Sequence, residues 1–387
     1  MVYDRIIIGG GAAGLYCAAL SPVGRGLILE KKRSPGQKLL LSGSGQCNLT
    51  HGGSIKDFIG HYGPGGSKIR SALYKASNLS LMDFFTDRGL ELIERADGKV
   101  FPKSMEAAQV LGLLLRQAKE NGWILRTNCP VTSLTAENDG TFLINGRLRT
   151  KQAVVATGGC SYPDTGSDGS MLPLLDKLGL KLIPPKPALV PVTVQQYPYS
   201  GLAGISFGEA QVSIDGHSLT GGLLLTHSSF SGPAVLNLSR YARPGSRLKI
   251  SYLPRAEIPD TAGDRRRADT VLADRFQIPK RFAEVLLMRA GVDPALKAAS
   301  LSASSLRTVT ALLQEDTFSI SGTSGFGSAM ATSGGISLEE VNTKTFESKQ
   351  YPGLFLIGEV LDIDGDTGGY NLQFAFSSGY GAASCVL

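Results

Sequence analysis

Short apolar runs alternate with stretches of helical periodicity over much of the chain. Residues 3–8 enter through Asp4 and Arg5 and continue as three isoleucines, which is typical of a buried strand. Similar patterns predict strands at 26–29, 123–131, 153–157 and 354–357, and helical patterns at 15–20, 67–78, 79–88, 104–121 and 372–379. Apolar runs that alternate with helices in this way predict an α/β fold.

The middle of the chain has a different pattern, which begins after the proline cluster at 184–187. Short strand patterns separated by glycine-containing turns occur at 190–196, 209–214, 223–226 and 247–252, and they predict a small barrel or sandwich. Helical patterns follow at 265–275, 279–290, 294–299 and 302–313, and a return strand is predicted at 317–321.

Glycines follow the first predicted strand directly. Residues 9–14 read Gly-Gly-Gly-Ala-Ala-Gly and fit the G-x-G-x-x-G pattern between a strand and a helix, the context that makes it a dinucleotide fingerprint. Gly9 permits the tight turn, Gly11 lets a pyrophosphate approach the backbone, and Gly14 lets the helix pack closely on the strand. The helix N-terminus then offers free N–H groups to the phosphates.

An acid closes the second predicted strand. Glu30 lies 21 residues after Gly9, a distance at which its carboxylate can accept hydrogen bonds from both ribose hydroxyls. It also disfavours a 2′-phosphate, so we expect FAD or NAD as the dinucleotide.

Three further segments favour FAD over NAD. The stretch 35–50 alternates small and hydrogen-bonding residues, the apolar strand at 153–156 ends in Thr157-Gly158-Gly159, and the strand at 354–357 leads into Asp362–Asn371 and a helix. FAD fills a cleft built by both ends of a chain, whereas a nicotinamide needs no distant second segment. The N–H groups of residues 369–371 would stabilise negative charge on reduced flavin.

Several sequence blocks also resemble one bacterial flavoprotein family. They are GGGAAG, GQKLLLSGSGQCNLTH, ATGG, THSSFSGPAVLNLS, TSGGISLEEV and LFLIGEVLDIDGDTGGYNLQFAFSSGYGA. Together they resemble the aminoacetone oxidase family of FAD-binding enzymes, also called NAD(P)/FAD-dependent oxidoreductases, with one branch named for a 3-dehydro-bile-acid Δ4,6-reductase. The chain departs from the family at Gln46, where arginine is usual, and at Ser229, where glycine is usual.

The resemblance implies a Rossmann-like two-segment FAD-binding domain with an inserted β-barrel-like domain and a small helical subdomain. We assign 1–189 to the first FAD segment, 190–255 to the β domain, 256–315 to the helical subdomain, 316–330 to the return strand and 331–387 to the second FAD segment. Motif and resemblance together predict cofactor contacts from Gly9, Gly11, Ala12, Ala13, Gly14, Glu30, Lys31, Lys38, Ser42, Gly43, Gly45, Gln46, Cys47, Asn48, Val131, Thr157, Gly158, Gly159, Gly358, Glu359, Asp364, Gly368, Gly369, Tyr370 and Asn371.

The expected activity is that of an FAD-dependent oxidoreductase, with hydride transfer through flavin N5 on a small organic substrate. By resemblance, this is either an NAD(P)H-dependent reductase acting on C=C or an amine oxidase. The candidate catalytic residues are His227, Tyr370 and Asn371. His227 could face the flavin from the insertion and donate a proton, and Tyr370 and Asn371 lie nearest the expected flavin by position. The spacing of the four histidines suggests no metal site.

Composition adds bounds on partners and location. The 387 residues include 48 glycines, where average usage would give roughly 27. The net charge of +6 suits an acidic ligand, but residues 255–300 carry nine basic against seven acidic side chains, which indicates a solvated surface and not a nucleic-acid stripe. We therefore expect no nucleic-acid or membrane partner and, without a signal peptide pattern, a cytoplasmic protein. A flavoprotein acting on tRNA and an FAD-binding protein without catalytic activity remain the alternatives.

Overall fold

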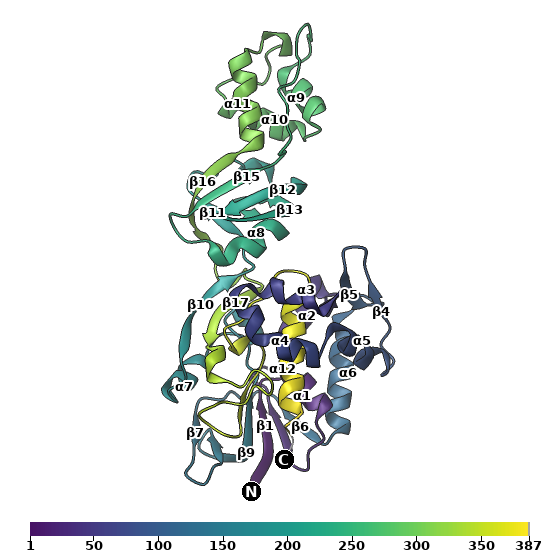
Figure 1. The fold of residues 1–387 in the computed structure, drawn as a ribbon, viewed down its shortest axis with the longest axis vertical. Helices are drawn as coiled ribbons and strands as arrows, with labels where there is room; N and C mark the ends of the chain where they lie inside the picture. The colour runs from purple at the N-terminus through teal and green to yellow at the C-terminus, as the bar shows by residue number, and fades with distance from the viewer. Residues whose placement is uncertain (386–387) are drawn as a thin grey trace. The chain divides into compact units, whose positions relative to one another are not determined.

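A computed structural model describes residues 1–385 and divides into two compact units. The first unit combines Met1–Ala188 with the C-terminal segment from Phe326, and the second unit is Leu189–Gly325. Both ends of the chain therefore contribute to the first unit (Figure 1).

A seven-stranded sheet forms the centre of the first unit. Its order is β6-β2-β1-β9-β8-β7, and β18 pairs with β9 as well. The strands β6, β2, β1, β9 and β18 run parallel, whereas β8 and β7 form an antiparallel extension. Their bounds are β1 Val2–Ile8, β2 Gly26–Leu29, β6 Trp123–Arg126, β7 Leu134–Ala136, β8 Phe142–Ile144, β9 Leu148–Val155 and β18 Leu354–Leu356. The α/β prediction is confirmed, but the strand expected at 123–131 ends at Arg126.

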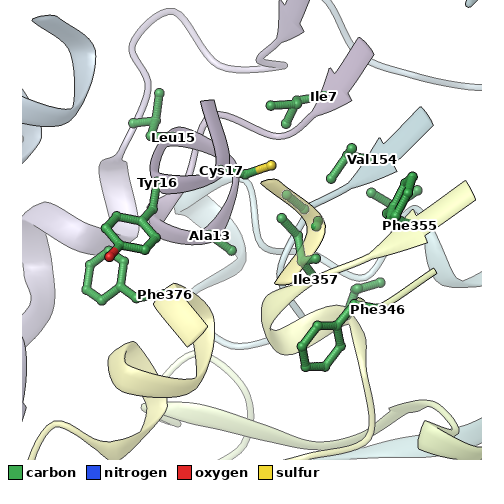
Figure 2. Close-up of a cluster of buried hydrophobic side chains, with 14 of the residues drawn as sticks. Ile7, Ala13, Leu15, Tyr16, Cys17, Val154, Phe346, Phe355, Ile357 and Phe376 are labelled. Carbon is green, nitrogen blue, oxygen red and sulfur yellow. The ribbon is translucent and has the colours of Figure 1, made fainter. Parts of the chain in front are cut away.

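Two helices from opposite ends of the chain lie side by side against this sheet. They are α1 (Ala12–Leu20) and α12 (Tyr370–Ala383), and a Cβ on Gly379 of α12 would lie 2.8 Å from the Ala13 carbonyl oxygen of α1. Figure 2 shows Ile7, Val154 and Phe355 of the strands in one buried cluster with side chains of the two helices. The strands are continuously apolar because helices and loops cover them on both faces.

The other elements of the first unit surround this core. The helices are α2 Gln37–Leu41, α3 Ile55–Phe58, α4 Gly66–Lys75, α5 Asn78–Thr86, α6 Ala107–Glu120 and α7 Leu172–Lys177. A small sheet has the order β3-β5-β4, with bounds β3 Thr50–His51, β4 Leu92–Glu94 and β5 Lys99–Pro102. No helix among residues 1–385 has both the length and the apolar character needed to cross a membrane.

The proline cluster after which the sequence pattern changes lies within a strand. β10 (Leu182–Ala188) contains Pro184, Pro185 and Pro187 and pairs antiparallel with β17 (Ala331–Ile336) in a two-stranded sheet. The register shifts between Ile183 and Lys186, which spares the first two prolines from the ladder. Proline is tolerated here because a two-stranded sheet has only edges and a bulge absorbs the missing N–H donors.

The second unit is a closed six-stranded barrel with attached helices, as predicted for the inserted β domain. The barrel order is β11-β14-β13-β12-β15-β16, with bounds β11 Val192–Val194, β12 Ser206–Ile214, β13 His217–Leu225, β14 Phe230–Ser231, β15 Arg247–Ser251 and β16 Asp316–Thr323. The helices are α8 Pro233–Leu238, α9 Ala268–Phe276, α10 Lys280–Arg289 and α11 Ala303–Gln314. Tyr199, Phe230 and Phe282 pack in its core.

The helix predicted at 294–299 is wrong. Only a 3₁₀ turn forms there, at Ala298–Ser300. The N–H groups of Ala298 and Ala299 bond the carbonyl oxygens of Arg266 and Asp264, at 2.9 Å each. Tertiary pairing with the segment before α9 therefore replaces the helical hydrogen bonds that the local pattern predicted.

Candidate nucleotide cofactor site

The glycine turn between β1 and α1 has one open position and two closed ones. Gly9 has φ +109°, and a Cβ there would lie 2.7 Å from the Ala156 carbonyl carbon. A Cβ on Gly14 would overlap the Gly9 carbonyl oxygen and lie 3.0 Å from Ile7 Cγ2. A Cβ on Gly11, the N-cap residue of α1, would meet nothing within 4 Å. Space for a ligand therefore exists at Gly11, beside the free N–H groups of the helix.

Glu30 ties the turn to the end of β2. Its Oε2 accepts the Gly10 N–H at 2.9 Å, and its Oε1 accepts the Lys32 N–H at 2.8 Å. The Cys129 N–H bonds the Glu30 carbonyl oxygen at 2.9 Å, which brings the segment carrying Val131 beside the acid. Each carboxylate oxygen retains acceptor capacity for a ribose hydroxyl.

The loop that follows α2 has an unusual backbone. Gly43, Ser44, Gly45 and Cys47 all have positive φ, between 57° and 86°. Left-handed conformations at the two non-glycine residues Ser44 and Cys47 cost energy, which the surrounding contacts of the loop must offset. The Ser42 hydroxyl donates to the Leu39 carbonyl oxygen at 2.6 Å, and with its amide turned to suit its neighbours, the Asn48 oxygen accepts the Gly369 N–H at 3.1 Å.

Lys38 takes part in a network that joins four segments of the first unit. Its ammonium group pairs with Glu359 and donates to the Ser161 hydroxyl. The Ser161 hydroxyl donates to Glu359 Oε1 at 2.9 Å, and the same oxygen accepts the Thr332 N–H at 2.6 Å. Lys38 and Glu359 were both predicted to contact the cofactor. In the structure their side chains join the segments that carry Lys38, Ser161, Thr332 and Glu359. Lys31, by contrast, pairs with Asp168 at 2.5 Å near the surface.

Two buried hydroxyls next to the Thr-Gly-Gly turn have no partner. Thr157 Oγ1 and Ser167 Oγ are buried without a hydrogen bond among the described residues. Ser167 Oγ lies beside the turn, because a Cβ on Gly158 would approach it to 2.7 Å. Buried unsatisfied hydroxyls are costly, so they point to a polar ligand that completes them.

The C-terminal segment brings the N-terminus of α12 to the same region. Gly358 has φ +70° and a Cβ there would lie 3.0 Å from Ala13 Cβ, so this glycine lies against the start of α1. Gly369 is the N-cap of α12 with φ +101°, and a Cβ there would lie 2.5 Å from the Thr50 carbonyl oxygen. The predicted residues of both chain ends therefore meet, with Asp364 buried in the loop between them.

Asn371 and Tyr370 differ in what their side chains can do. The Asn371 amide accepts the Gly365 N–H at 2.8 Å and donates to the Gly365 carbonyl oxygen at 2.9 Å, so it clamps the loop before the helix. Tyr370 is buried between two imidazoles, with ring centroids 5.3 Å from His51 and 4.0 Å from His61. Burial and the nearby Asp366 carboxylate raise the pKa of Tyr370 to about 12, so the phenol keeps its proton.

The remaining candidates are placed as follows. Cys47 is fully buried, and burial raises the pKa of its thiol to about 12. His227 lies exposed in the loop between β13 and β14 of the second unit. Gln46 accepts a hydrogen bond from Arg95 at 2.8 Å, and the Arg95 guanidinium lies 4.1 Å from the centroid of the Phe101 ring. A cation thus stands beside Gln46, supplied by the β4–β5 turn.

Sequence reasoning missed Ser161, Thr332, Arg95, His61 and Asp366. Of these, Thr332 lies in the TSGGISLEEV block and Asp366 in the C-terminal block that the sequence singled out. The others carry no local signal, because their place in the site depends on contacts between distant segments.

The residues present fit FAD. Open space at Gly11, the acid at Glu30, the unsatisfied hydroxyls at Thr157 and Ser167 and the N-terminus of α12 are what a dinucleotide with a distant ring system requires. Gly9, Gly14, Gly358 and Gly369 provide the close backbone approaches around it.

Comparison with known proteins identifies relatives along the whole chain. Ribosomal RNA dihydrouridine synthase of Escherichia coli strain K12 is 30% identical over 402 residues, covering 100% of this chain and 98% of that protein. The 3-dehydro-bile acid Δ(4,6)-reductase of Clostridium scindens is also 30% identical over 402 residues, covering 97% and 96%.

A solved structure has the same fold. It is the 3-ketosteroid-Δ4-(5α)-dehydrogenase from Rhodococcus jostii RHA1 in complex with 4-androstene-3,17-dione, with a TM-score of 0.53 and 16% identity, covering 98% of this chain and 96% of that one.

One expectation about partners is wrong. The sequence predicted no nucleic-acid partner, but relatives of full length carry a name that includes ribosomal RNA. The charge balance of residues 255–300 does not exclude an RNA partner. Proteins recognise structured RNA by its shape and through dispersed contacts as well as through a basic stripe.

The model of the HI0933-like protein Rossmann domain matches residues 3–385. The chain therefore belongs to the HI0933-like family, whose Rossmann domain binds FAD, and it is an FAD-binding flavoprotein of the oxidoreductase type.

Proposed function

We propose that this protein is an FAD-dependent reductase of a carbon–carbon double bond conjugated to a carbonyl group, with a uridine of structured RNA as the preferred substrate. One observation carries the proposal: two relatives at 30% identity over nearly their full length are named for reductions of that same bond class. Dihydrouridine is uridine with its ring double bond saturated next to a carbonyl, and the double bonds of a 3-dehydro Δ(4,6) bile acid are conjugated to the 3-keto group.

The chemistry of such a reduction divides between cofactor and protein. When bound, FAD supplies a hydride from N5 to the carbon remote from the carbonyl. The protein must hold the substrate, keep water out and deliver one proton to the neighbouring carbon. The glycine turn and Glu30 hold the nucleotide half of the cofactor, and Asn371 fixes the loop that leads into α12. The first-turn N–H groups of α12 favour negative charge at the ligand.

The net charge of the chain supports RNA as the molecule that contains the substrate uridine. The chain has 39 basic and 33 acidic side chains, for a net charge of +6 and a pI near 9.0. This excess of positive charge is divided between the two units. The second unit carries 14 basic and 11 acidic residues, so it contributes a net +3. A dispersed positive charge attracts a polyanion without base specificity, and its contribution falls as salt rises.

An anaerobic half-reaction experiment tests the proposal. The holoprotein is reduced with NADH or NADPH and then mixed with an unmodified ribosomal RNA transcript, a 4-ene-3-keto steroid or 2-cyclohexen-1-one, while the visible flavin absorbance is followed. We expect reoxidation by the transcript, and nuclease digestion with mass spectrometry should find uridine that has gained two hydrogens. Reoxidation by the steroid or the cyclic enone alone would assign a small-molecule substrate and refute the RNA part. No reoxidation by any of the three would refute the reductase itself.

A further inference from the structure

Asp366, in the loop that leads into α12, forms an acid–imidazole pair with His61, and neither residue was predicted to contact the cofactor. His61, in the 3₁₀ segment Ile59–Gly65, places Nδ1 3.0 Å from Asp366 Oδ2. The Asp366 N–H also donates to the His61 carbonyl oxygen at 2.9 Å. These two residues are separated by 305 positions in sequence, yet backbone and side chain both join them.

The ring of His61 has a defined orientation. It stacks on Tyr370, with centroids 4.0 Å apart and planes 15° apart, and Tyr370 is the first residue of α12. A carboxylate only accepts hydrogen bonds, so Nδ1 of His61 carries a proton and Nε2 remains available for exchange. The side chain is 39% exposed, which leaves Nε2 open to a ligand or to solvent.

The second histidine on the Tyr370 ring, His51, has different hydrogen-bond partners. Both ring nitrogens of His51 lie 3.0 Å from backbone carbonyl oxygens, those of Gly52 and Asp97. His51 therefore has no ring nitrogen left for a substrate, and it packs against Gly98, where a Cβ would lie 2.7 Å from Nε2. Of the two histidines that stack on Tyr370, His61 is the one that combines a carboxylate partner, a fixed ring and an accessible nitrogen.

Other groups near the cofactor region are poorly suited to donate the proton. Cys47 is fully buried, and the Asn371 amide is engaged in the loop clamp. Tyr370 is 4% exposed and enclosed between imidazoles. The ionisable groups that face the His61–Tyr370 stack are Asp366, Asp57, Tyr62 and His51.

We infer that His61, oriented by Asp366, is the proton donor for the proposed reduction, an inference that rests on the proposed function. The nicotinamide donor would supply two electrons and one proton, together a hydride, which FAD when bound would pass to the carbon remote from the carbonyl to form the new C–H bond. The electron pair of the double bond moves toward the carbonyl oxygen. The imidazolium of His61 then gives its Nε2 proton to the carbon next to the carbonyl, and solvent reprotonates the ring. Asp366 is a positioning residue, because it acts through His61.

The test uses the holoprotein and separates the two half-reactions. With His61→Gln we expect flavin reduction by NADH or NADPH at the wild-type rate and substrate reduction slowed by roughly 10²-fold or more, the usual share of a general acid. Asp366→Asn should slow the same half-reaction less. Added imidazole should restore part of the rate to His61→Ala, which a merely structural role would not allow.

A matched control and a second readout are available. His217 also stacks on a tyrosine, Tyr241, with centroids 3.7 Å apart, but it is not among the residues that form the candidate site of the first unit, so we expect His217→Gln to change neither half-reaction. Nitrogen-15 NMR of labelled histidine should find the His61 proton on Nδ1 in the wild type and shifted toward Nε2 in Asp366→Asn. This measurement needs no turnover.

The possible failures are distinguishable. If wild type reduces a double bond and His61→Gln does so equally fast, the inference about His61 is overturned while the proposed function stands. If both half-reactions of His61→Gln slow together and FAD is lost, the role is structural and the inference is overturned. If wild-type protein reduces none of the three probes, the proposed function fails and the inference fails with it.

Discussion

Replacing Gly11 by alanine should weaken FAD binding and leave the stability of the apoprotein nearly unchanged. Replacing Gly14 by alanine should instead lower the stability of the apoprotein. At Gly11 a Cβ meets nothing within 4 Å, and φ −90° with ψ −169° is accessible to alanine. Restricting the unfolded chain favours alanine by about 0.4–1 kcal/mol, and the loss of an N-cap glycine costs a similar amount. We therefore expect the stability of the apoprotein to change by less than about 1 kcal/mol.

The substitution at Gly11 should act on the free energy of FAD binding. The added methyl group occupies the open space through which a pyrophosphate approaches, and overpacking of this kind costs about 1–3 kcal/mol, or roughly 5- to 150-fold in affinity. At Gly14 the methyl group overlaps the Gly9 carbonyl oxygen and comes within 3.1 Å of Ala156 Cβ. That clash is present without FAD, so the cost of about 1–3 kcal/mol falls on folding.

The assay compares apoproteins and their titrations. Thermal unfolding of apoprotein should show little change for Gly11→Ala and a lower midpoint for Gly14→Ala, by about 2–4 °C per kcal/mol for a unit of this size. FAD titration can follow the fluorescence of Trp123, the single tryptophan, which lies in β6. If Gly11→Ala binds FAD with wild-type affinity, the pyrophosphate does not pass this glycine and the assignment of the cradle is wrong.

Three further outcomes are expected. Glu30→Ala should destabilise the apoprotein by about 1–3 kcal/mol, because two backbone N–H groups lose their acceptor, and should also weaken FAD binding; wild-type affinity in calorimetric titration would contradict the ribose assignment. Glu359→Gln should lower the thermal midpoint of the apoprotein by disconnecting Lys38, while Glu91→Gln, whose lysine pair is fully exposed, should not. Cys47 should resist alkylation at pH 8 in the folded protein, since a thiol pKa of about 12 leaves about one thiolate in ten thousand; rapid labelling detected by mass spectrometry would refute its burial. Because that folded pKa lies above the unfolded value, the thiol's contribution to stability is fully present below about pH 9 and is lost as the pH rises toward 12.

The sequence predicted the cofactor site well where the requirement was local. A glycine needed for a turn or a close approach must occupy a fixed place in the chain. The spacing of Gly9, Gly11 and Gly14 therefore predicts the dinucleotide-binding motif. The strands β1, β2 and β18 were predicted because their apolar runs are uninterrupted. Most of the predicted cofactor residues are brought to one region, although their individual contacts with FAD stay predictions.

Prediction failed where pairing between distant segments overrode a local pattern. The helix expected at 294–299 gave way to backbone pairing with the segment before α9. The partner prediction failed for a related reason, since a segment's charge count does not describe a surface assembled from many segments.

The sequence by itself determined that this chain folds as an α/β dinucleotide-binding protein with an inserted β domain, because apolar periodicity and glycine spacing are properties of neighbouring residues. Only the tertiary structure decided what the reactive side chains can do. It buried Cys47, engaged the Asn371 amide in a loop and joined His61 to Asp366. Burial, hydrogen-bond partners and ring stacking are set by segments that meet in space from distant parts of the chain, so no local pattern specifies them.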